Sequence, residues 1–306
     1  MRVTQILSCL AAFPLLTGAS PPVTIKPSSK WVLDYADDSC RLIRVFGQEK
    51  SETKLLFESV APEEMTMLVV GGALRADDGM LPVKARLLPR KGEPLIGASA
   101  RADKGGQGAA IWSHLPFEKD YDDKPEKKPA AGRERARVDE RKPIDRIKWA
   151  AARAERMKLA EQTTGIEIEQ RQGHGVILET GSLGSPLKMF DECERDLLRQ
   201  WGVDPDVQDR IVKPVWTKSL MSLFSSGDYP TAMLAARAQS NVRVRLLVDA
   251  GGKVAKCASI SLFNAPDFNR LVCDVFRTRA RFEPAELADG TKVASYYTQR
   301  VNFRMP

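Results

Sequence analysis

The sequence predicts an α+β protein with two domains: a β-rich N-terminal domain that carries a helix and a long charged insertion, and a smaller C-terminal domain with the order ββαβ. The first observation is a series of short runs of alternating apolar and polar residues, separated by Gly, Pro and Asp, which are typical of strands and turns. The second is the presence of apolar residues at three- and four-residue steps, which predicts helices. With 306 residues, 43% of them hydrophobic, the chain is long enough to bury a core in each domain.

The β-rich domain is expected over residues 31–203, followed by a linker at 204–214. Its strands are predicted at Trp31–Tyr35, Lys54–Phe57, Met65–Val70, Val83–Leu88, Gly165–Glu169 and Gly175–Gly181. Its helices are predicted over 144–160 and from about 182 to 201, with one or two further helical turns within 38–46.

A charged insertion at about residues 118–143 interrupts this domain, because the segment contains almost no large apolar side chain. Its mixture of acidic and basic residues predicts a solvated loop, with a basic anchoring arm as the alternative. The whole chain has a net charge of +7 and a pI near 9.1. Its basic residues form no patch interleaved with aromatic residues, so no nucleic-acid partner is predicted.

The N-terminus has the features of a secretory signal peptide over residues 1–19. Arg2 provides a short positive region, Ile6–Leu16 is an apolar run, and Ala19 follows small residues that are typical of a cleavage site. The run is shorter than the roughly 20 residues that cross a bilayer. We therefore expect a periplasmic protein with no stable membrane insertion after cleavage, although retention of the segment as an anchor stays open. Residues 20–30 are expected to form a disordered lead-in.

Four cysteines remain after removal of the signal peptide, which takes Cys9 with it. An even number of cysteines in an oxidising compartment predicts two disulfides, for which three pairings exist. The spacing favours Cys40 with Cys193 and Cys257 with Cys273, because each pair then lies within one predicted domain.

No pattern predicts catalysis, a metal site or a cofactor, so we expect a protein that is not an enzyme. Glu179-Thr-Gly181 carries Glu where aspartic proteases carry Asp, and it has no second copy to complete a carboxylate dyad. Hydrolase motifs of the Gly-x-Ser-x-Gly and His-Glu-x-x-His types are absent from the sequence. The two histidines, His114 and His174, form no Cys/His cluster that would bind zinc. An enzyme housed in the β-rich domain, with groups near Glu179 or His174, is the alternative.

The C-terminal domain, expected over 215–306, has the most regular pattern in the chain. Val242–Asp249 and Val254–Ser261 alternate on either side of a Gly-Gly turn, which predicts a β-hairpin. Apolar residues at helical spacing over Phe268–Thr278 predict one amphipathic helix, and Val293–Phe303 predicts a last strand. The expected architecture is one helix packed over a three-stranded antiparallel sheet.

Several short segments of this domain have an order and a spacing that together are characteristic of one family. They are Tyr229-Pro230, Val242–Asp249, Gly251–Val254, Arg281–Ala285, Asp289-Gly290 and Val301–Phe303. With them, roughly residues 215–306 resemble the C-terminal domain of TonB-type energy transducers. The N-terminal domain resembles only uncharacterised exported proteins that carry such modules, which assigns it no activity.

The resemblance implies a module that binds an extended segment of a partner by adding a strand to an exposed sheet edge. The implied edge is Val293–Phe303, and the implied partner is a protein or peptide, such as a segment of an outer-membrane transporter. The candidate partner-binding residues are Tyr229, Pro230, Val293, Tyr297, Gln299, Arg300, Val301 and Phe303. Arg300 and Arg304 would favour an acidic peptide, or would instead protect the edge from aggregation. A homodimer through the terminal strand is a further expectation.

Two departures from the family bear on function. Family transducers have a permanent membrane helix that carries a histidine, followed by a Pro-rich spacer. Here the N-terminal apolar run is short and contains no histidine, and a β-rich domain replaces the spacer. We therefore expect a soluble periplasmic binding or adaptor protein, with an anchored energy transducer as the alternative.

Overall fold

The structure is a computed structural model with helices and strands around two hydrophobic cores, which confirms the predicted α+β class. It describes residues 21–36, 38–62, 64–89, 93–102, 107–113, 136–138, 146–170, 175–217, 220–260 and 266–304. The predicted signal peptide, both histidines and most of the charged insertion lie outside these ranges. Within them, no helix combines the length and the apolar character needed to cross a membrane.

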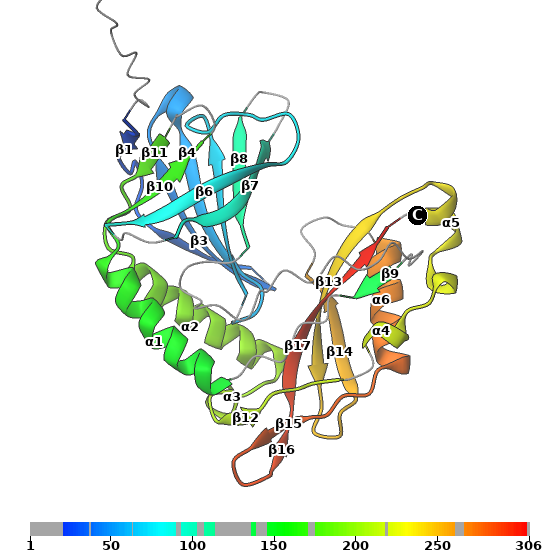
Figure 1. The fold of residues 1–306 in the computed structure, drawn as a ribbon. Coiled ribbons are helices and arrows are strands. Elements are labelled where there is room, and N and C mark those ends of the chain that lie inside the picture. The colour runs from blue at the N-terminus through cyan, green and yellow to red at the C-terminus, as the bar shows by residue number, and fades with distance from the viewer. Residues whose placement is uncertain are drawn as a thin grey trace, which may run out of the picture.

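A ten-stranded sheet in the order β1-β11-β10-β6-β7-β8-β5-β4-β3-β2 surrounds the first core. Its strands are β1 (Val23–Ile25), β2 (Val32–Ala36), β3 (Ser39–Phe46), β4 (Thr53–Ser59), β5 (Met65–Gly71), β6 (Leu81–Leu88), β7 (Leu95–Arg101), β8 (Gly108–Trp112), β10 (Gly165–Glu169) and β11 (Gly175–Leu178). Neighbouring strands are antiparallel except β1 and β11. A bridge between Pro27 and Phe46 joins the segment after β1 to the end of β3, so the sheet curves round toward itself (Figure 1).

Alternating apolar residues explain why these segments form strands. In β4 and β5, Leu55, Phe57, Met67 and Val69 are completely buried, while the residues between them are partly exposed. Burial of each such side chain contributes about 1.5–3 kcal/mol. Residues 39–46, where helical turns are predicted, instead form β3, because pairing with β2 and β4 on both sides outweighs local helical spacing.

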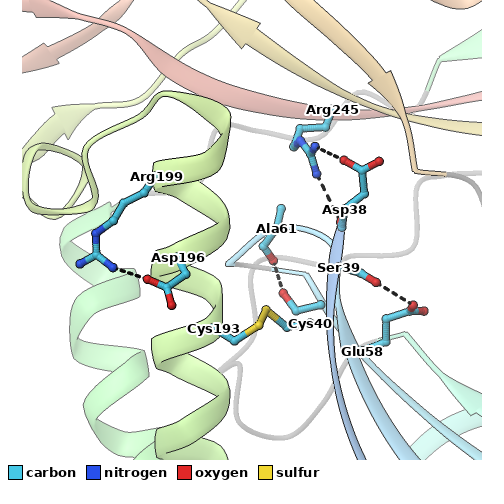
Figure 2. Close-up of a disulfide and its surroundings, with 10 residues drawn as sticks. Asp38, Ser39, Cys40, Glu58, Ala61, Cys193, Asp196, Arg199 and Arg245 are labelled. Carbon is cyan, nitrogen blue, oxygen red and sulfur yellow. Dashed lines mark hydrogen bonds and ion pairs between the residues drawn. A yellow bond between two sulfur atoms is a disulfide. The ribbon is translucent and has the colours of Figure 1, made fainter. Parts of the chain in front are cut away.

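Two helices pack beside this sheet: α1 (Arg146–Gln162) and α2 (Gly184–Trp201). The apolar face of α2 is buried, and the helix ends at Gly202 in the left-handed conformation, with φ of 84°. The disulfide Cys40–Cys193 ties β3 to α2, with Cα atoms 6.0 Å apart (Figure 2). The second predicted disulfide, Cys257–Cys273, also forms.

The second core lies between a sheet in the order β14-β13-β17-β9 and helix α6. The elements of this part are β9 (Ala136–Val138), α4 (Leu220–Leu223), α5 (Thr231–Ala235), β13 (Ser240–Val248), β14 (Val254–Ser259), α6 (Pro266–Arg279) and β17 (Ser295–Phe303). The three predicted antiparallel strands are confirmed as β14, β13 and β17. The fourth strand, β9, comes from the charged insertion and was not predicted.

Three further segments differ from the sequence prediction. Residues 23–25 lie in the expected lead-in but form β1. The expected linker contains α3 (Pro205–Gln208) and β12 (Ile211–Lys213). Val293 belongs to β16 (Lys292–Val293), which pairs with β15 (Ala285–Leu287) in a small separate sheet with β12 rather than extending β17. The domain boundaries themselves stay a prediction.

The two cores meet at the face of the C-terminal sheet opposite α6. Tyr296 on β17 belongs to the first core, and Leu247 on β13 packs against it. Arg245 on β13 reaches Asp38 (Figure 2). Its guanidinium also lies over the ring of Trp201 at the end of α2. The first domain therefore covers one face of the second domain's sheet.

Candidate strand-binding edge

Most of the predicted partner-binding side chains are buried in the second core. Tyr229, Tyr297, Gln299, Val301 and Phe303 are each at most 9% exposed. Their side chains therefore form the α6-facing side of the domain, and any contact of β17 with a partner strand has to use the backbone. Their role in partner binding stays a prediction.

Tyr229 shows what the Tyr-Pro pair does in this fold. Its ring packs edge-on against Phe268 and Phe303, with centroids 5.5 and 5.6 Å away, and its hydroxyl donates to the carbonyl of Ala238. Burial raises the pKa of this hydroxyl. Pro230, which is half-buried, directly precedes α5.

The turn before Tyr229 is held to the end of α6 by a two-pronged ion pair. Arg279 donates to both carboxylate oxygens of Asp228 at 2.8 Å, and the same carboxylate accepts hydrogen bonds from the backbone and hydroxyl of Ser225. The hydrogen bond from Arg279 is the main cause that lowers the pKa of Asp228 to about 2. The Tyr-Pro turn is thus fixed in place by charge-assisted hydrogen bonds.

The direction of the backbone groups of β17 follows from the strand register. Ile260 donates its backbone N–H to the carbonyl of Arg243, so Arg243 on β13 exchanges hydrogen bonds with the β14 side. Backbone groups alternate in direction along an antiparallel strand, so Val244 faces β17 and bonds its partner Gln299. By the same alternation, the odd-numbered residues of β17 bond β13. The even-numbered residues Tyr296, Thr298, Arg300 and Asn302 direct their N–H and C=O groups to the outer edge.

That outer edge is already occupied at both of its ends. At the start, the side chain of Gln208 on α3 donates to the carbonyl of Ala294 at 3.0 Å. At the end, β9 lies beside β17 (Figure 1) and pairs with its residues 301–303. Arg137 is opposite Asn302. Between them, the backbone of Thr298 points outward, and no strand in the described part of the chain pairs with it. The implied edge Val293–Phe303 is therefore exposed only in part, because β9 pairs with residues 301–303 and Val293 belongs to β16.

Two buried polar side chains of β17, those of Tyr297 and Gln299, form a chain of hydrogen bonds next to Thr298. The hydroxyl of Tyr297 donates to Oε1 of Gln299 at 3.2 Å, and Nε2 of Gln299 donates to the carbonyl of Arg300 at 2.9 Å. The Arg300 carbonyl points to the outer edge, so Gln299 interacts with the edge from within the core. Neither the contact of Gln208 nor the direction of each backbone group could be predicted from the sequence. Both depend on how the strands are aligned with one another in the fold.

The opposite edge of the sheet, β14, is protected by three features. The ladder between β13 and β14 shifts register near Leu247, which indicates a bulge. Lys256 is exposed on the strand, and Arg277 of α6 donates to the carbonyl of Cys257 at 3.3 Å. Bulges and lysines are known devices that block edge pairing. β17 pairs with β13 over nine residues without a shift, so its geometry is the more suitable for an added strand.

The arginines of the sheet face contact the first domain. Arg243 lies opposite Arg300 across the two strands and forms an ion pair with Glu64, whose carboxylate also accepts a hydrogen bond from the hydroxyl of Thr298. Burial, with a further contribution from Arg300, lowers the pKa of Arg243 to about 10. The predicted attraction of an acidic peptide by Arg300 stays a prediction, whereas Arg304 is exposed at the end of β17.

Of the two residues named for the enzyme alternative, Glu179 lies in the described part of the chain and His174 lies outside it. Glu179 is exposed, and its backbone N–H donates to the carbonyl of Ile25. The hydroxyl of Ser99 donates to Asp77 at 2.7 Å beside a hollow that is no larger than a water molecule. Over the described residues, no group of three or more His, Cys, Asp or Glu side chains is arranged to hold a metal ion.

Comparison with known proteins supports the resemblance read from the sequence. Residues 226–305 match the family model of the Gram-negative bacterial TonB protein C-terminal. No curated protein and no solved structure matches the chain. The matched segment spans Tyr229-Pro230 and every strand of the C-terminal sheet except β9. This part of the chain is therefore similar to the TonB C-terminal domain family, which is a family of protein-interaction modules.

Proposed function

We propose that this protein is a soluble periplasmic adaptor that binds an extended segment of an envelope protein by strand addition at the outer edge of β17. The observation that carries the proposal is that β17 already accepts a strand from a distant part of the chain at this edge. An edge that pairs with one added antiparallel strand has the regular spacing of donors and acceptors that another strand requires.

The backbone provides the affinity in this proposal, since the core-facing side chains of β17 are buried. Each backbone hydrogen bond gained contributes about 0.5–1.5 kcal/mol after its exchange with water. The partner segment would pair first with the backbone of Thr298. It would then pair with the neighbouring N–H and C=O groups of β17 that point to the outer edge. No catalytic step is part of this function, in keeping with the protein-interaction character of the matched family.

The test uses Thr298, because its N–H points away from β13. Proline at this position removes an outward donor and leaves the ladder with β13 intact. We expect Thr298→Pro to reduce the capture of envelope proteins from detergent-solubilised outer membranes by up to about tenfold.

Thr298→Val is the matched control, since it removes the hydroxyl contact with Glu64 and keeps the backbone donor. It should capture the same proteins as the unmodified chain. A proline at Val301 is unsuitable, because the N–H of Val301 faces Val242 on β13 and its loss would damage the sheet itself. Equal capture by the proline and valine variants would refute strand addition at this edge.

Anchored energy transduction is the second candidate, and the match to the TonB C-terminal family favours it. In that case residues 1–19 would be retained as a membrane anchor. N-terminal sequencing of the mature protein and its distribution between soluble periplasmic and inner-membrane fractions separate the two. Retention of Met1 together with inner-membrane location would replace the adaptor with the transducer.

A further inference from the structure

The strand β9 joins two parts of the chain that belong to different cores. It lies in the connection between β8 and α1, which both belong to the N-terminal domain, yet it pairs with β17 of the C-terminal sheet. It also lies against α4. The first domain therefore donates a strand to the second, at the edge where the proposed partner would bind.

The pairing is short, and its hydrogen-bonding pattern can be derived from the register. Val301 and Phe303 direct their backbone groups to β13, so Asn302 is the residue of this stretch that exchanges hydrogen bonds with β9, through Arg137. Ala136 and Val138 then direct their N–H and C=O groups away from β17. A single exchanging pair makes two hydrogen bonds, which correspond to an affinity change on the order of tenfold to a hundredfold.

So few hydrogen bonds are sufficient when β9, a segment of the same chain, competes with a partner strand for the edge of β17. Residues of one chain meet at an effective concentration that reaches the millimolar range when the connection permits it. A short strand can therefore occupy the edge without strong contacts of its own, and a longer partner strand can still displace it.

We propose that β9 is a built-in competitor that occupies the end of the β17 edge and is displaced when a partner strand binds. This inference rests on the proposed function. It predicts that the free protein binds a partner strand less tightly than a protein whose β17 edge is not occupied by β9. Weakening the pairing of β9 with β17 should therefore increase the affinity for the partner.

Arg137→Pro tests the inference, because it removes the N–H that faces Asn302. Ala136→Pro is the matched control, since the N–H of Ala136 points away from β17. Hydrogen exchange of the full-length oxidised protein should show faster exchange of the Asn302 amide in Arg137→Pro and unchanged exchange in Ala136→Pro. Replacing residues 136–138 with Gly-Ser-Gly gives a second variant that weakens the strand without a proline.

The binding arm uses a synthetic peptide of residues 133–141 of this chain as the probe. In the register of β9, residues 136–141 of such a peptide would lie opposite Phe303 to Thr298. We expect Arg137→Pro and the Gly-Ser-Gly variant to bind it about tenfold more tightly than the unmodified chain or Ala136→Pro do.

Equal peptide affinity in all four proteins, or equal Asn302 exchange in the two proline variants, would overturn the inference. Failure of the proposed function gives a different result. In that case, capture of envelope proteins would be insensitive to Thr298→Pro, while the effects of β9 on Asn302 exchange and on the synthetic peptide would remain.

Discussion

Replacement of Arg245 should show how the two domains are held together. Its guanidinium lies 3.5 Å from the centroid of the Trp201 ring and donates to the carboxylate of Asp38 at 2.6 Å. Two longer contacts, of 3.4 Å each, reach the carbonyls of Asp38 and Val60. Burial lowers the pKa of Arg245, while Asp38 raises it. The Arg245 side chain is only 8% exposed, whereas that of Asp38 is 56% exposed.

These exposures decide which contact dominates. The cation–π contact is desolvated and is worth about 2 kcal/mol. The ion pair has one partner at the surface and is worth at most about 1 kcal/mol. Arg245→Met keeps the apolar stem and removes the charge, so we expect it to lower the free energy of unfolding by about 2–3 kcal/mol in total.

The assay is urea denaturation of the oxidised full-length chain, followed by circular dichroism and tryptophan fluorescence. Double-mutant cycles of Arg245→Met with Trp201→Leu and with Asp38→Asn isolate the two coupling energies. Arg270→Met is the matched control, because Arg270 is 72% exposed and should change stability by less than about 0.5 kcal/mol. A larger coupling of Arg245 to Asp38 than to Trp201 would refute the reasoning, as would a coupling to Trp201 below about 0.5 kcal/mol.

Two further predictions concern the C-terminal domain. Replacing Cys257 and Cys273 together with alanine opens a link across 16 residues and should cost about 3 kcal/mol in the chain-entropy model, read as a lower urea midpoint under oxidising conditions; an unchanged midpoint would contradict it. The carboxyl of Asp228 has a folded pKa of about 2, below the roughly 3.9 of an unfolded chain. Its stabilisation is therefore present above pH 4 and is lost as the pH falls toward 2. Asp228→Asn should be less stable than the unmodified protein at pH 7, and the difference should shrink as the pH falls through 2 in pH-dependent thermal unfolding. A difference as large at pH 2 as at pH 7 would assign the effect to something other than ionisation.

Features with strong local signals were predictable from the sequence. The hairpin of β13 and β14 alternates on both sides of a Gly-Gly turn, and α6 has a clear apolar face, so both were placed within a few residues. The disulfide pairs followed from their spacing within each domain. The resemblance to the TonB C-terminal family also came from local segments, whose order is retained in the fold.

Features that depend on long-range pairing were missed. β9 has only three residues in a charged segment, so no alternation distinguishes it, and it exists as a strand because β17 pairs with it. One or two helical turns are predicted within residues 38–46, but Ser39–Phe46 forms a strand because it pairs with β2 and β4. The burial of Tyr229 and Phe303 likewise depends on how the turn before α5 packs against α6.

The position of the first domain has a consequence for how the edge must be studied. One face of the C-terminal sheet packs against α6, and the other carries Tyr296, Arg243 and Arg245, which the first domain buries. A fragment that begins at residue 215 would expose this face and would also lose β9. Its edge would then be free of the competitor while its sheet would lose the contacts of Arg245 and Tyr296. Strand binding by such a fragment would therefore overstate the affinity of the intact protein, and only the full chain contains both the edge and its competitor.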